Sequence, residues 1–415
     1  MRIAIIGTGI SGMTAGYLLG RDHDVVAYEA NGVAGGHTAT VDVPINGRTW
    51  SVDTGFIVFN HKTYPNFTRL LDRLAVASQP SVMSFSMQDM TSGLVFCPSS
   101  LNALFIQRRN LVRPAFYRML LDAWRFKNGA RRLLASSDDE ITLDDYLSAN
   151  RFGSDFIHRF LIPMGAAIWS AGPDAFRNFP ARYFAEFFEN HGFLNVVDQP
   201  QWRVIQGGSR NYIGPLTRSF ADRIRVDSPV AAITRSPGQV TVTTADGHPD
   251  TFDHVVIAAH SDQALAMLTD PSAAERDVLG RIAYQANDVL LHTDTSVLPP
   301  RRAAWASWNY LNPERPQDRV ALTYNMNILQ GLDAPVTFCV SLNIGDRVDP
   351  GKVIRRFVYH HPMYTPDSLA ARRRHRDISG VNRTSYCGAY WGYGFHEDGV
   401  NSALAVGREF GKELR

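Results

Sequence analysis

Three glycines near the start of the chain, Gly7, Gly9 and Gly12, have the spacing of a phosphate-binding turn. Glycine at these positions permits a tight turn, the close approach of a pyrophosphate and close packing of the following helix. Glu29 lies 20 residues after Gly9, where a carboxylate accepts a hydrogen bond from a ribose 2′-hydroxyl and repels a 2′-phosphate. These residues predict a dinucleotide site and disfavour NADP.

A buried strand and a helix must position these glycines. The run RIAIIG is apolar and β-branched, which is typical of a strand buried on both faces of a parallel sheet. A helical pattern starts at Ser11, so the glycines fall at the turn between strand and helix. The next strand, HDVVAYEA, carries Glu29 near its end. We therefore expect Ile10, Ser11 and Ala30 to lie at the cofactor too.

The composition limits the class of protein. The 415 residues are 45% hydrophobic, with a formal net charge of +2, which favours a globular chain of two domains over a disordered or nucleic-acid-binding one. The three cysteines lack metal-ligand spacing, so no metal is predicted and a reducing compartment is indicated. No signal peptide or long apolar segment is evident, which predicts a cytoplasmic protein that could lie at the inner face of a membrane.

Two further segments suggest a family. ANGVAGGHTAT, after Glu29, and YCGAYWGYGFHEDGVNSALAVGREFGKEL, near the end of the chain, resemble the flavoprotein amine oxidase and phytoene desaturase superfamily. The resemblance implies non-covalent FAD rather than NAD, and a last helix whose first turn, near Gly399, Val400 and Asn401, faces the flavin. It places at the cofactor Gly35, Gly36, His37 (where the superfamily usually has arginine), Gly55, Phe56, Val230, Gly388, Gly399 and Val400.

The segments that resemble the superfamily are interleaved with segments that do not. We therefore expect an α/β fold in which a Rossmann-type FAD-binding domain of the amine oxidase (p-hydroxybenzoate hydroxylase-like) type is combined with an interleaved α+β substrate domain. The FAD-binding domain takes residues 1–60, 202–270 and 381–415, and the substrate domain takes 61–201 and 271–380. Within the latter, periodicity predicts helices over 113–134 and 143–170 and strands over 287–294, 320–327 and 337–343.

The residues that would act on a substrate are a separate set from those that would hold the cofactor. Amine oxidases of the superfamily place a lysine near flavin N5, on a strand whose counterpart here, YQANDVLLHTD, has Val289 instead. This absence disfavours amine oxidation. Tyr390, Trp391 and Tyr393 are candidates for the flavin face, and Tyr324 and Asn325 are candidates for the substrate cavity. The alternative for each of them is a packing role.

Several blocks, among them DTGFIVFNHKTYPNFTRLLDRLAV and LTYNMNILQGL, resemble a narrower flavoprotein family found with cyclopropane-fatty-acid-synthase-like methyltransferases. That resemblance implies desaturation of a methyl-branched, unsaturated fatty acyl chain in a phospholipid, with a methyltransferase as pathway partner. The reaction needs a base. The candidates are His61, His396 and Glu397. The alternative for His61 is a surface loop position, and for His396 a hydrogen bond to the backbone. The alternative for Glu397 is a helix cap.

Two other functions stay open: an amine oxidase or polyene desaturase acting on another apolar substrate, and a non-catalytic flavin- and lipid-binding partner of a methyltransferase.

A basic stretch of the chain indicates what kind of surface the protein could contact. Residues 105–132 hold eight basic residues, one acid and several interleaved apolar side chains. This pattern predicts contact with an anionic membrane rather than with nucleic acid, and its alternative is an ordinary solvated helix.

Overall fold

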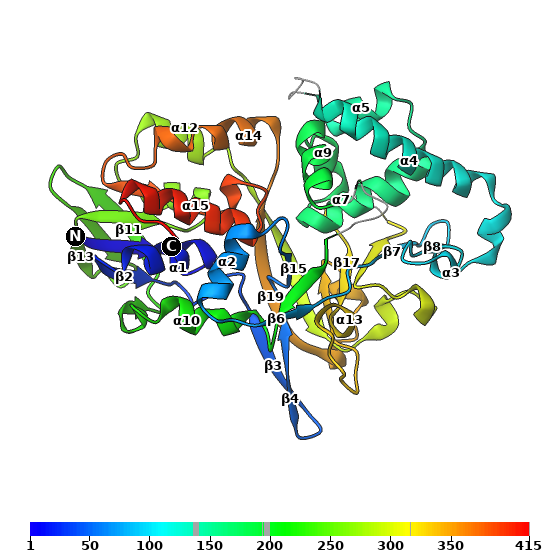
Figure 1. The fold of residues 1–415 in the computed structure, drawn as a ribbon, viewed down its shortest axis with the longest axis horizontal. Helices are drawn as coiled ribbons and strands as arrows, with labels where there is room; N and C mark the ends of the chain where they lie inside the picture. The colour runs from blue at the N-terminus through cyan, green and yellow to red at the C-terminus, as the bar shows by residue number, and fades with distance from the viewer. Residues whose placement is uncertain (136–140, 193, 195–199, 316, 415) are drawn as a thin grey trace.

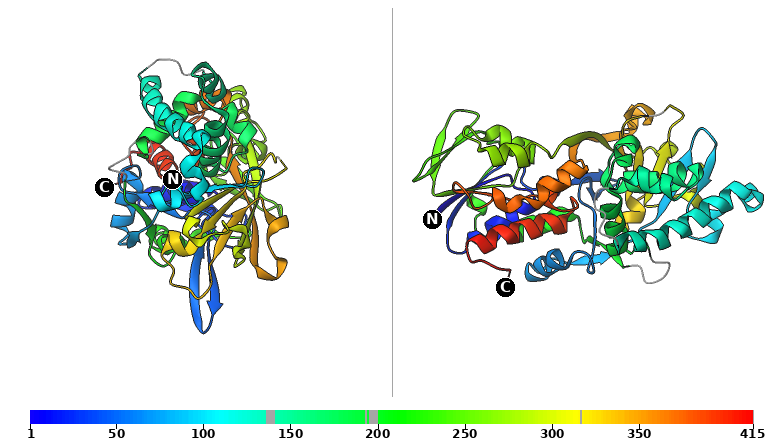
Figure 2. Two further views of the ribbon diagram at one scale, coloured as in Figure 1. Left: turned by 90° about the vertical axis from the view of Figure 1, so that its right-hand side faces the viewer. Right: turned by 90° about the horizontal axis from the view of Figure 1, so that it is seen from above.

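The computed structural model describes residues 1–415 except 136–140, 193, 195–199, 316 and 415. Two lobes lie side by side along the longest axis of the molecule (Figures 1 and 2). One lobe contains the N-terminus and a parallel sheet, and the other contains most of the helices between residues 100 and 190. The hairpin of β3 (Thr40–Ile45) and β4 (Arg48–Asp53) projects from the junction between them.

The parallel sheet belongs to the first lobe. Its five strands have the order β10-β2-β1-β14-β20, with all neighbours parallel. Along β1, Ile3 and Ile5 face one side of the sheet while Ala4 and Ile6 face the other, and all four are buried. The predicted strand with two buried faces is therefore confirmed. The strand bounds are β1 (Arg2–Ile6), β2 (Asp24–Tyr28), β10 (Ile224–Arg225), β14 (His254–Ile257) and β20 (Thr384–Tyr386).

Helices cover one face of this sheet, and a small antiparallel sheet with two helices covers the other. Helices α1 (Ile10–Leu19) and α15 (His396–Glu409) pack against each other and on the first face. The second face packs on β11 (Val230–Arg235), β12 (Val240–Thr244) and β13 (Pro249–Phe252), and on α11 (Ser261–Met267) and α12 (Ala273–Leu279). This layered arrangement is the Rossmann-type architecture that the sequence predicts.

One helix lies on the other side of the predicted domain limit. Helix α2 (Pro65–Arg73) follows residue 60, yet it packs against α15 in the first lobe. Phe67 and Leu70 of α2 share a buried cluster with Leu18 and Val400. A short sheet of β5 (Val58–Asn60), β9 (Trp202–Ile205) and β6 (Ser78–Pro80) also joins segments from both sides of that limit.

The second lobe is built on a seven-stranded sheet with helices packed on it. The strand order is β19-β15-β18-β17-β16-β7-β8, and a large, mainly aromatic and aliphatic core lies between the sheet and the helices. The three predicted strands correspond to β15, β17 and β18. The bounds are β7 (Phe85–Asp89), β8 (Leu94–Phe96), β15 (Tyr284–His292), β16 (Trp308–Asn312), β17 (Leu322–Asn325), β18 (Cys339–Leu342) and β19 (Val353–Pro362).

The first predicted long helix is confirmed, as α4 (Pro114–Leu134), and the second is wrong in its continuity. Residues 143–170 instead form α5 (Leu143–Ala149), α6 (Ser154–Phe156), a π-helical turn and α7 (Ile162–Trp169), because Gly153 and Pro163 interrupt the pattern. The remaining helices are α3 (Leu101–Leu104), α8 (Pro173–Arg177), α9 (Ala181–Asn190), α10 (Ile213–Thr217), α13 (Met326–Gln330) and α14 (Pro366–Arg373). Within the described residues, no helix is both long and apolar enough to cross a membrane.

Candidate functional site

The glycine turn lies between β1 and α1, as its spacing predicts. Gly7 has a φ of +98°, a conformation that side chains rarely adopt, and a Cβ on it would lie 2.9 Å from the carbonyl oxygen of Ala258. A Cβ on Gly12 would collide with the backbone of Gly7, so this glycine serves the packing of α1. A Cβ on Gly9, by contrast, would meet no atom of the described residues within 4 Å. The open space at Gly9 is where a phosphate group can approach the backbone.

Glu29 lies directly after β2 and is buried beside this turn. One carboxylate oxygen accepts hydrogen bonds from the backbone N–H and the hydroxyl of Thr8, at 3.1 and 2.5 Å. The other accepts from the backbone N–H and the side-chain amide of Asn31, at 3.0 and 2.8 Å. These contacts hold the carboxylate at the edge of the cavity, where it can accept from a ribose hydroxyl.

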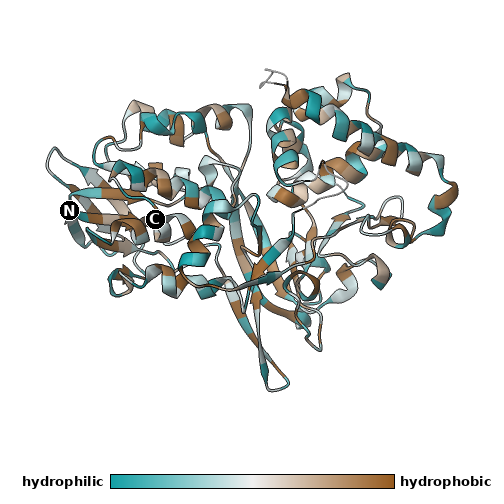
Figure 3. Ribbon diagram, viewed as in Figure 1, coloured by the Kyte–Doolittle hydropathy of each residue, from teal (hydrophilic) through white to brown (hydrophobic). Residues whose placement is uncertain are grey.

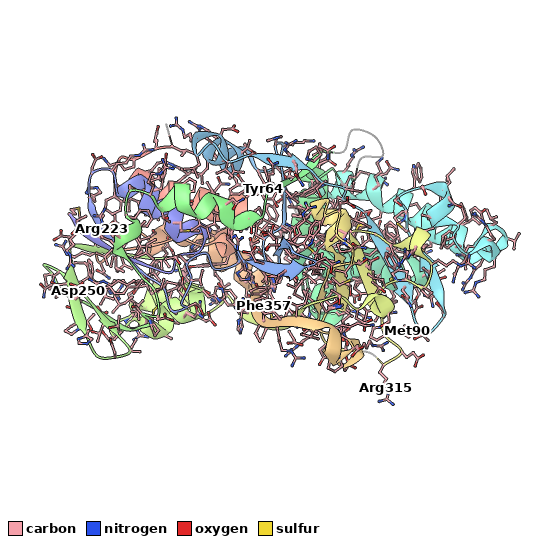
Figure 4. All side chains as sticks on the ribbon, turned by 90° about the horizontal axis from the view of Figure 1, so that it is seen from below. Tyr64, Met90, Arg223, Asp250, Arg315 and Phe357 are labelled. Carbon is pink, nitrogen blue, oxygen red and sulfur yellow. The ribbon has the colours of Figure 1, made fainter. Side chains whose placement is uncertain are left out.

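A cavity of about 780 Å³ extends from this turn into the space between the two lobes. At one end it is lined by the glycine turn and Glu29, and at the other by aromatic and aliphatic side chains of the second lobe. Tyr64, which is labelled near the middle of the molecule in Figure 4, lines it at the junction. The cavity therefore has a polar dinucleotide end and an apolar end, which we call the substrate end.

Most of the residues predicted at the cofactor line this cavity. They are Gly7, Gly9, Ile10, Ser11, Glu29, Ala30, Gly36, His37, Gly55, Phe56, Val230 and Gly388. Gly35 and Gly12 do not line it. A Cβ on Gly36 would lie 3.1 Å from the Cα of Gly9. The backbone of the second glycine pair therefore packs directly against the glycine turn. This paired-glycine cradle fits the diphosphate of FAD.

The expectation for Gly399 and Val400 is wrong. Helix α15 begins at His396, earlier than predicted, so the backbone N–H of Gly399 already donates to the carbonyl of Phe395 at 3.1 Å. A Cβ on Gly399 would meet the side chains of Ile10 and Ser11, and Val400 is fully buried. Both residues pack α15 against the first lobe. Residues 394–396, at the start of the helix, line the cavity instead.

His37 presents an imidazole to the dinucleotide end. Burial lowers its pKa to about 4, so the ring is neutral at pH 7, and its Nε2 has no hydrogen-bond partner among the described residues. Its ring lies 5.5 Å from that of His361, which also lines the cavity and whose Nδ1 is 2.9 Å from the side-chain nitrogen of Asn287. A buried polar nitrogen without a partner fits a site that a cofactor completes.

Two of the three candidate bases do not line the cavity. His61 is exposed, and its Nδ1 lies 3.3 Å from the hydroxyl of Thr68. Glu397 accepts hydrogen bonds from the backbone N–H groups of Asn66 and Phe67, at 3.1 and 2.8 Å, and so supports the start of α2. Burial raises the pKa of Glu397. The structure therefore corrects both predictions: one residue faces solvent and the other supports a helix.

His396 does line the cavity. Its ring stacks on Phe56 with centroids 3.5 Å apart, and its Nε2 lies 3.0 Å from the hydroxyl of Tyr212 and 3.2 Å from that of Thr38. Complete enclosure holds the pKa of this imidazole well below its usual range, so the ring is neutral. A neutral imidazole keeps one nitrogen lone pair that can accept a proton, while the burial that lowers its pKa makes it a weaker base than a free imidazole.

The substrate end is a wall of rings and aliphatic chains contributed by several elements. Tyr324, Tyr390 and Tyr393 line the cavity, whereas Trp391 does not and Asn325 instead caps α13. Sequence reasoning missed most of the wall, including Met83, Ile168, Trp169, Phe187, His191, Trp308, Leu329 and Tyr364. The only signal for them was apolar periodicity, which does not distinguish a cavity wall from a core.

Charged groups are scarce in this lining. Among the described residues that line the cavity, Glu29 is the only carboxylate and there is no lysine or arginine. Val289, at the place expected for the lysine of amine oxidases, is buried in the core of the second lobe. The cysteines Cys97, Cys339 and Cys387 are buried away from the lining. Within the described chain, no cluster of three or more histidine, cysteine or acidic side chains is arranged to hold a metal ion.

A paired-glycine cradle on a Rossmann-type lobe, joined to a largely apolar cavity, defines a dinucleotide-dependent oxidoreductase. Residues 10–326 match the family of flavin-containing amine oxidoreductases. The chain belongs to this family, so it is a flavoprotein oxidoreductase, and the prediction of FAD is confirmed. A comparison with curated protein sequences finds no match.

Solved structures share the fold across the whole chain. Cyclohexylamine oxidase from Brevibacterium oxydans is 16% identical with a TM-score of 0.70, over 99% of both chains. A CLA-producing fatty acid isomerase from P. acnes is 18% identical with a TM-score of 0.69, over 98% of both chains. A putative protoporphyrinogen oxidase from Exiguobacterium is 16% identical with a TM-score of 0.67, over 99% of this chain and 98% of the other. These likenesses confirm the predicted fold class.

Proposed function

We propose that the protein is an FAD-dependent oxidoreductase that introduces a double bond into a fatty acyl chain, methyl-branched and unsaturated, carried by a phospholipid. In this reaction one carbon of the chain loses a hydride and a neighbouring allylic carbon loses a proton, so a new C=C bond forms. FAD supplies the hydride acceptor when bound. The residues of the cavity supply the position of the chain, the exclusion of water and the acceptor for the proton.

The observation that carries the proposal is the lining of the substrate end. Trp169, Phe187 and Trp308, with aliphatic side chains between them, form a wall without a charged side chain in the described part of the chain. An acyl chain gains free energy on leaving water for such a wall, whereas a charged amine loses its hydration there without a carboxylate to pair with. The resemblance to a family that modifies acyl chains, and the fatty acid isomerase among the structural neighbours, support the same substrate class.

His396 is the base in this proposal, because it is the candidate that reaches the cavity. The hydroxyls of Tyr212 and Thr38 lie within hydrogen-bond distance of His396 Nε2 and so hold the imidazole in place. Stacking on Phe56 fixes the plane of the ring. A neutral imidazole fixed at the wall can take the allylic proton from a carbon that is held beside it.

One observation favours a second candidate, the oxidation of an amine. The rings of Trp169, Trp308 and Tyr324 line the substrate end of the cavity. Aromatic faces attract ammonium groups, and cyclohexylamine oxidase is among the structural neighbours. The absence of a lysine at the position of Val289 makes this the weaker candidate.

The test is the visible absorption of the purified protein under anaerobic conditions. Phospholipids with methyl-branched, unsaturated chains should bleach the flavin band, and mass spectrometry of the lipid should show the loss of two hydrogens. The saturated phospholipid of equal length is the matched control and should leave the band unchanged. Bleaching by cyclohexylamine but by no lipid would establish the second candidate, and a band that neither substrate bleaches would contradict both.

A further inference from the structure

Exposed apolar side chains gather on one part of the second lobe. Of the thirteen large hydrophobic residues that are exposed in the described chain, six lie between residues 101 and 124. Val112 is 84% exposed, Leu101 77% and Trp124 62%. We call this region, residues 101–125, the docking surface. Its exposed apolar members are Leu101, Leu111, Val112, Tyr117, Leu121 and Trp124.

The apolar side chains on α4 occupy one face of the helix. Tyr117, Leu121 and Trp124 follow one another at spacings of four and three residues, so they lie along one side. Phe116, Met119 and Phe126 lie on the opposite side and are buried in the core of the lobe. The helix is therefore already anchored by its inner face, and its outer apolar face is free to meet a partner.

Arginines surround these apolar side chains. Arg108, Arg109, Arg113 and Arg118 lie among them, and in the described part of the chain none of the four pairs with a carboxylate. The side chains of Arg108 and Arg109 reach carbonyl and amide oxygens instead. The stretch 105–132 has eight basic residues against one acid, whereas the rest of the chain has more acidic than basic residues. The positive charge of the protein is thus concentrated here.

We propose that the docking surface binds an anionic lipid bilayer, with the apolar side chains entering the headgroup region and the arginines contacting lipid phosphates. Exposed leucine, valine and tryptophan side chains interleaved with arginines have the chemistry of a segment that lies in a membrane interface. A basic surface is drawn to anionic lipid, while the net negative remainder of the chain is repelled, which sets the orientation. A second copy of this chain fits less well, because a two-fold interface would bring the same arginines together.

The place of the docking surface in the fold agrees with this role. The arm formed by α3, the following turn and α4 lies at the end of the second lobe that is farthest from the parallel sheet (Figures 1 and 2). Figure 3 shows hydrophobic and hydrophilic segments alternating along this arm. The arm can therefore lie on a flat surface without covering the dinucleotide end. This inference is independent of the proposed substrate.

Co-sedimentation of the flavin-loaded protein with lipid vesicles tests the proposal. The protein should bind vesicles that contain phosphatidylglycerol, bind pure phosphatidylcholine vesicles weakly, and lose binding as salt is raised. The triple variant R108E/R109E/R113E should lose binding by at least about a hundredfold, because each basic residue near an anionic surface contributes roughly fivefold. Unchanged binding by this variant, or no binding of the unaltered protein to any vesicle, overturns the proposal.

A matched variant controls for the change in net charge. R73E/R319E/R355E makes the same change at exposed arginines outside the docking surface, and it should bind the anionic vesicles nearly as well as the unaltered protein. Equal losses in the two triple variants would show that total charge alone governs binding, and would overturn the proposed surface.

The apolar contribution is tested separately. L111S/V112S removes two exposed side chains, so the fold and the flavin content should be unchanged, while binding to anionic vesicles falls by about tenfold. Light scattering distinguishes the competing occupant: a dimer in solution that L111S/V112S dissociates would make this surface a subunit interface and overturn the bilayer proposal.

Discussion

The two ends of the cavity are built in different ways. The centre of the dinucleotide end is one local segment, because Gly7, Gly9 and Glu29 lie within one strand-helix-strand unit. The substrate end takes its wall from α7, α9, β16 and β17, which are far apart in the chain. The first end follows from backbone geometry that a few residue types permit. The substrate end follows from tertiary packing. Substitutions in its wall can therefore change which substrate binds without changing which cofactor binds.

The largest expected effect is at Gly9. G9L places a side chain in the open space of the cradle, and because the φ of Gly9 is −66° the backbone tolerates it. Flavin binding should weaken by at least about a hundredfold, the equivalent of ~3 kcal/mol of overpacking. The flavin-to-protein absorbance ratio measures it. G214L, at another glycine with open space, is the control and should keep its flavin. Full flavin content in G9L would contradict the assigned dinucleotide end.

The next effect is at His396, the first residue of α15 and part of the cavity lining. H396Q keeps a polar side chain but removes the imidazole, so the turnover number should fall by roughly a hundredfold while flavin is retained. Anaerobic flavin reduction in a stopped-flow instrument measures it. A fall of less than about threefold would assign the ring to packing and leave the proton acceptor elsewhere.

A variant at the substrate end should lower activity without changing flavin binding. I168W enlarges a partly exposed side chain of the wall, so kcat/KM for the acyl substrate should fall by about thirtyfold, within the range for a group misfitted to an apolar pocket. I168V is the conservative control. Loss of flavin in I168W would show that the two ends are not separable.

A smaller effect is expected at His37. H37A removes the unpaired Nε2 and should weaken flavin binding by about tenfold, as for one hydrogen bond to a charged group. H37R installs the residue that the superfamily usually has here and should bind flavin at least as well as the unaltered protein. If H37A kept full affinity, the imidazole would have no role at the cofactor.

The smallest effect is at Glu397, next to His396 but outside the cavity. E397Q should change the turnover number by less than about twofold and lower the free energy of unfolding by about 1 kcal/mol, because a helix cap is weakened. The raised pKa of Glu397 gives a stability contribution that is full at acid pH and is lost as the pH rises through that pKa. Urea unfolding should be measured between acid and neutral pH. The difference in free energy of unfolding between the unaltered protein and E397Q should become smaller as the pH rises. A large loss of turnover would restore Glu397 as a base candidate.

The same contrast explains what the sequence could predict. The glycine turn, Glu29 and the strands beside them follow from local spacing and burial, and the structure places them as expected. His61 and Glu397 are close in sequence to flavin-binding segments, but nearness in sequence does not determine the direction of a side chain. Because α15 starts at His396, the backbone N–H of Gly399 is bonded within the helix and is not a free first-turn amide. The exact ends of helices are the least predictable feature of a sequence.

The strand order of the parallel sheet has a consequence for biosynthesis. The strands β1 and β14 at its centre are followed, more than a hundred residues later, by β20, and α15 then packs on α1. These contacts of long sequence separation form slowly. A nascent chain that stops before residue 388 lacks Gly388 and His396 of the cavity lining, so we expect flavin to be loaded only after this part of the lining has been synthesised.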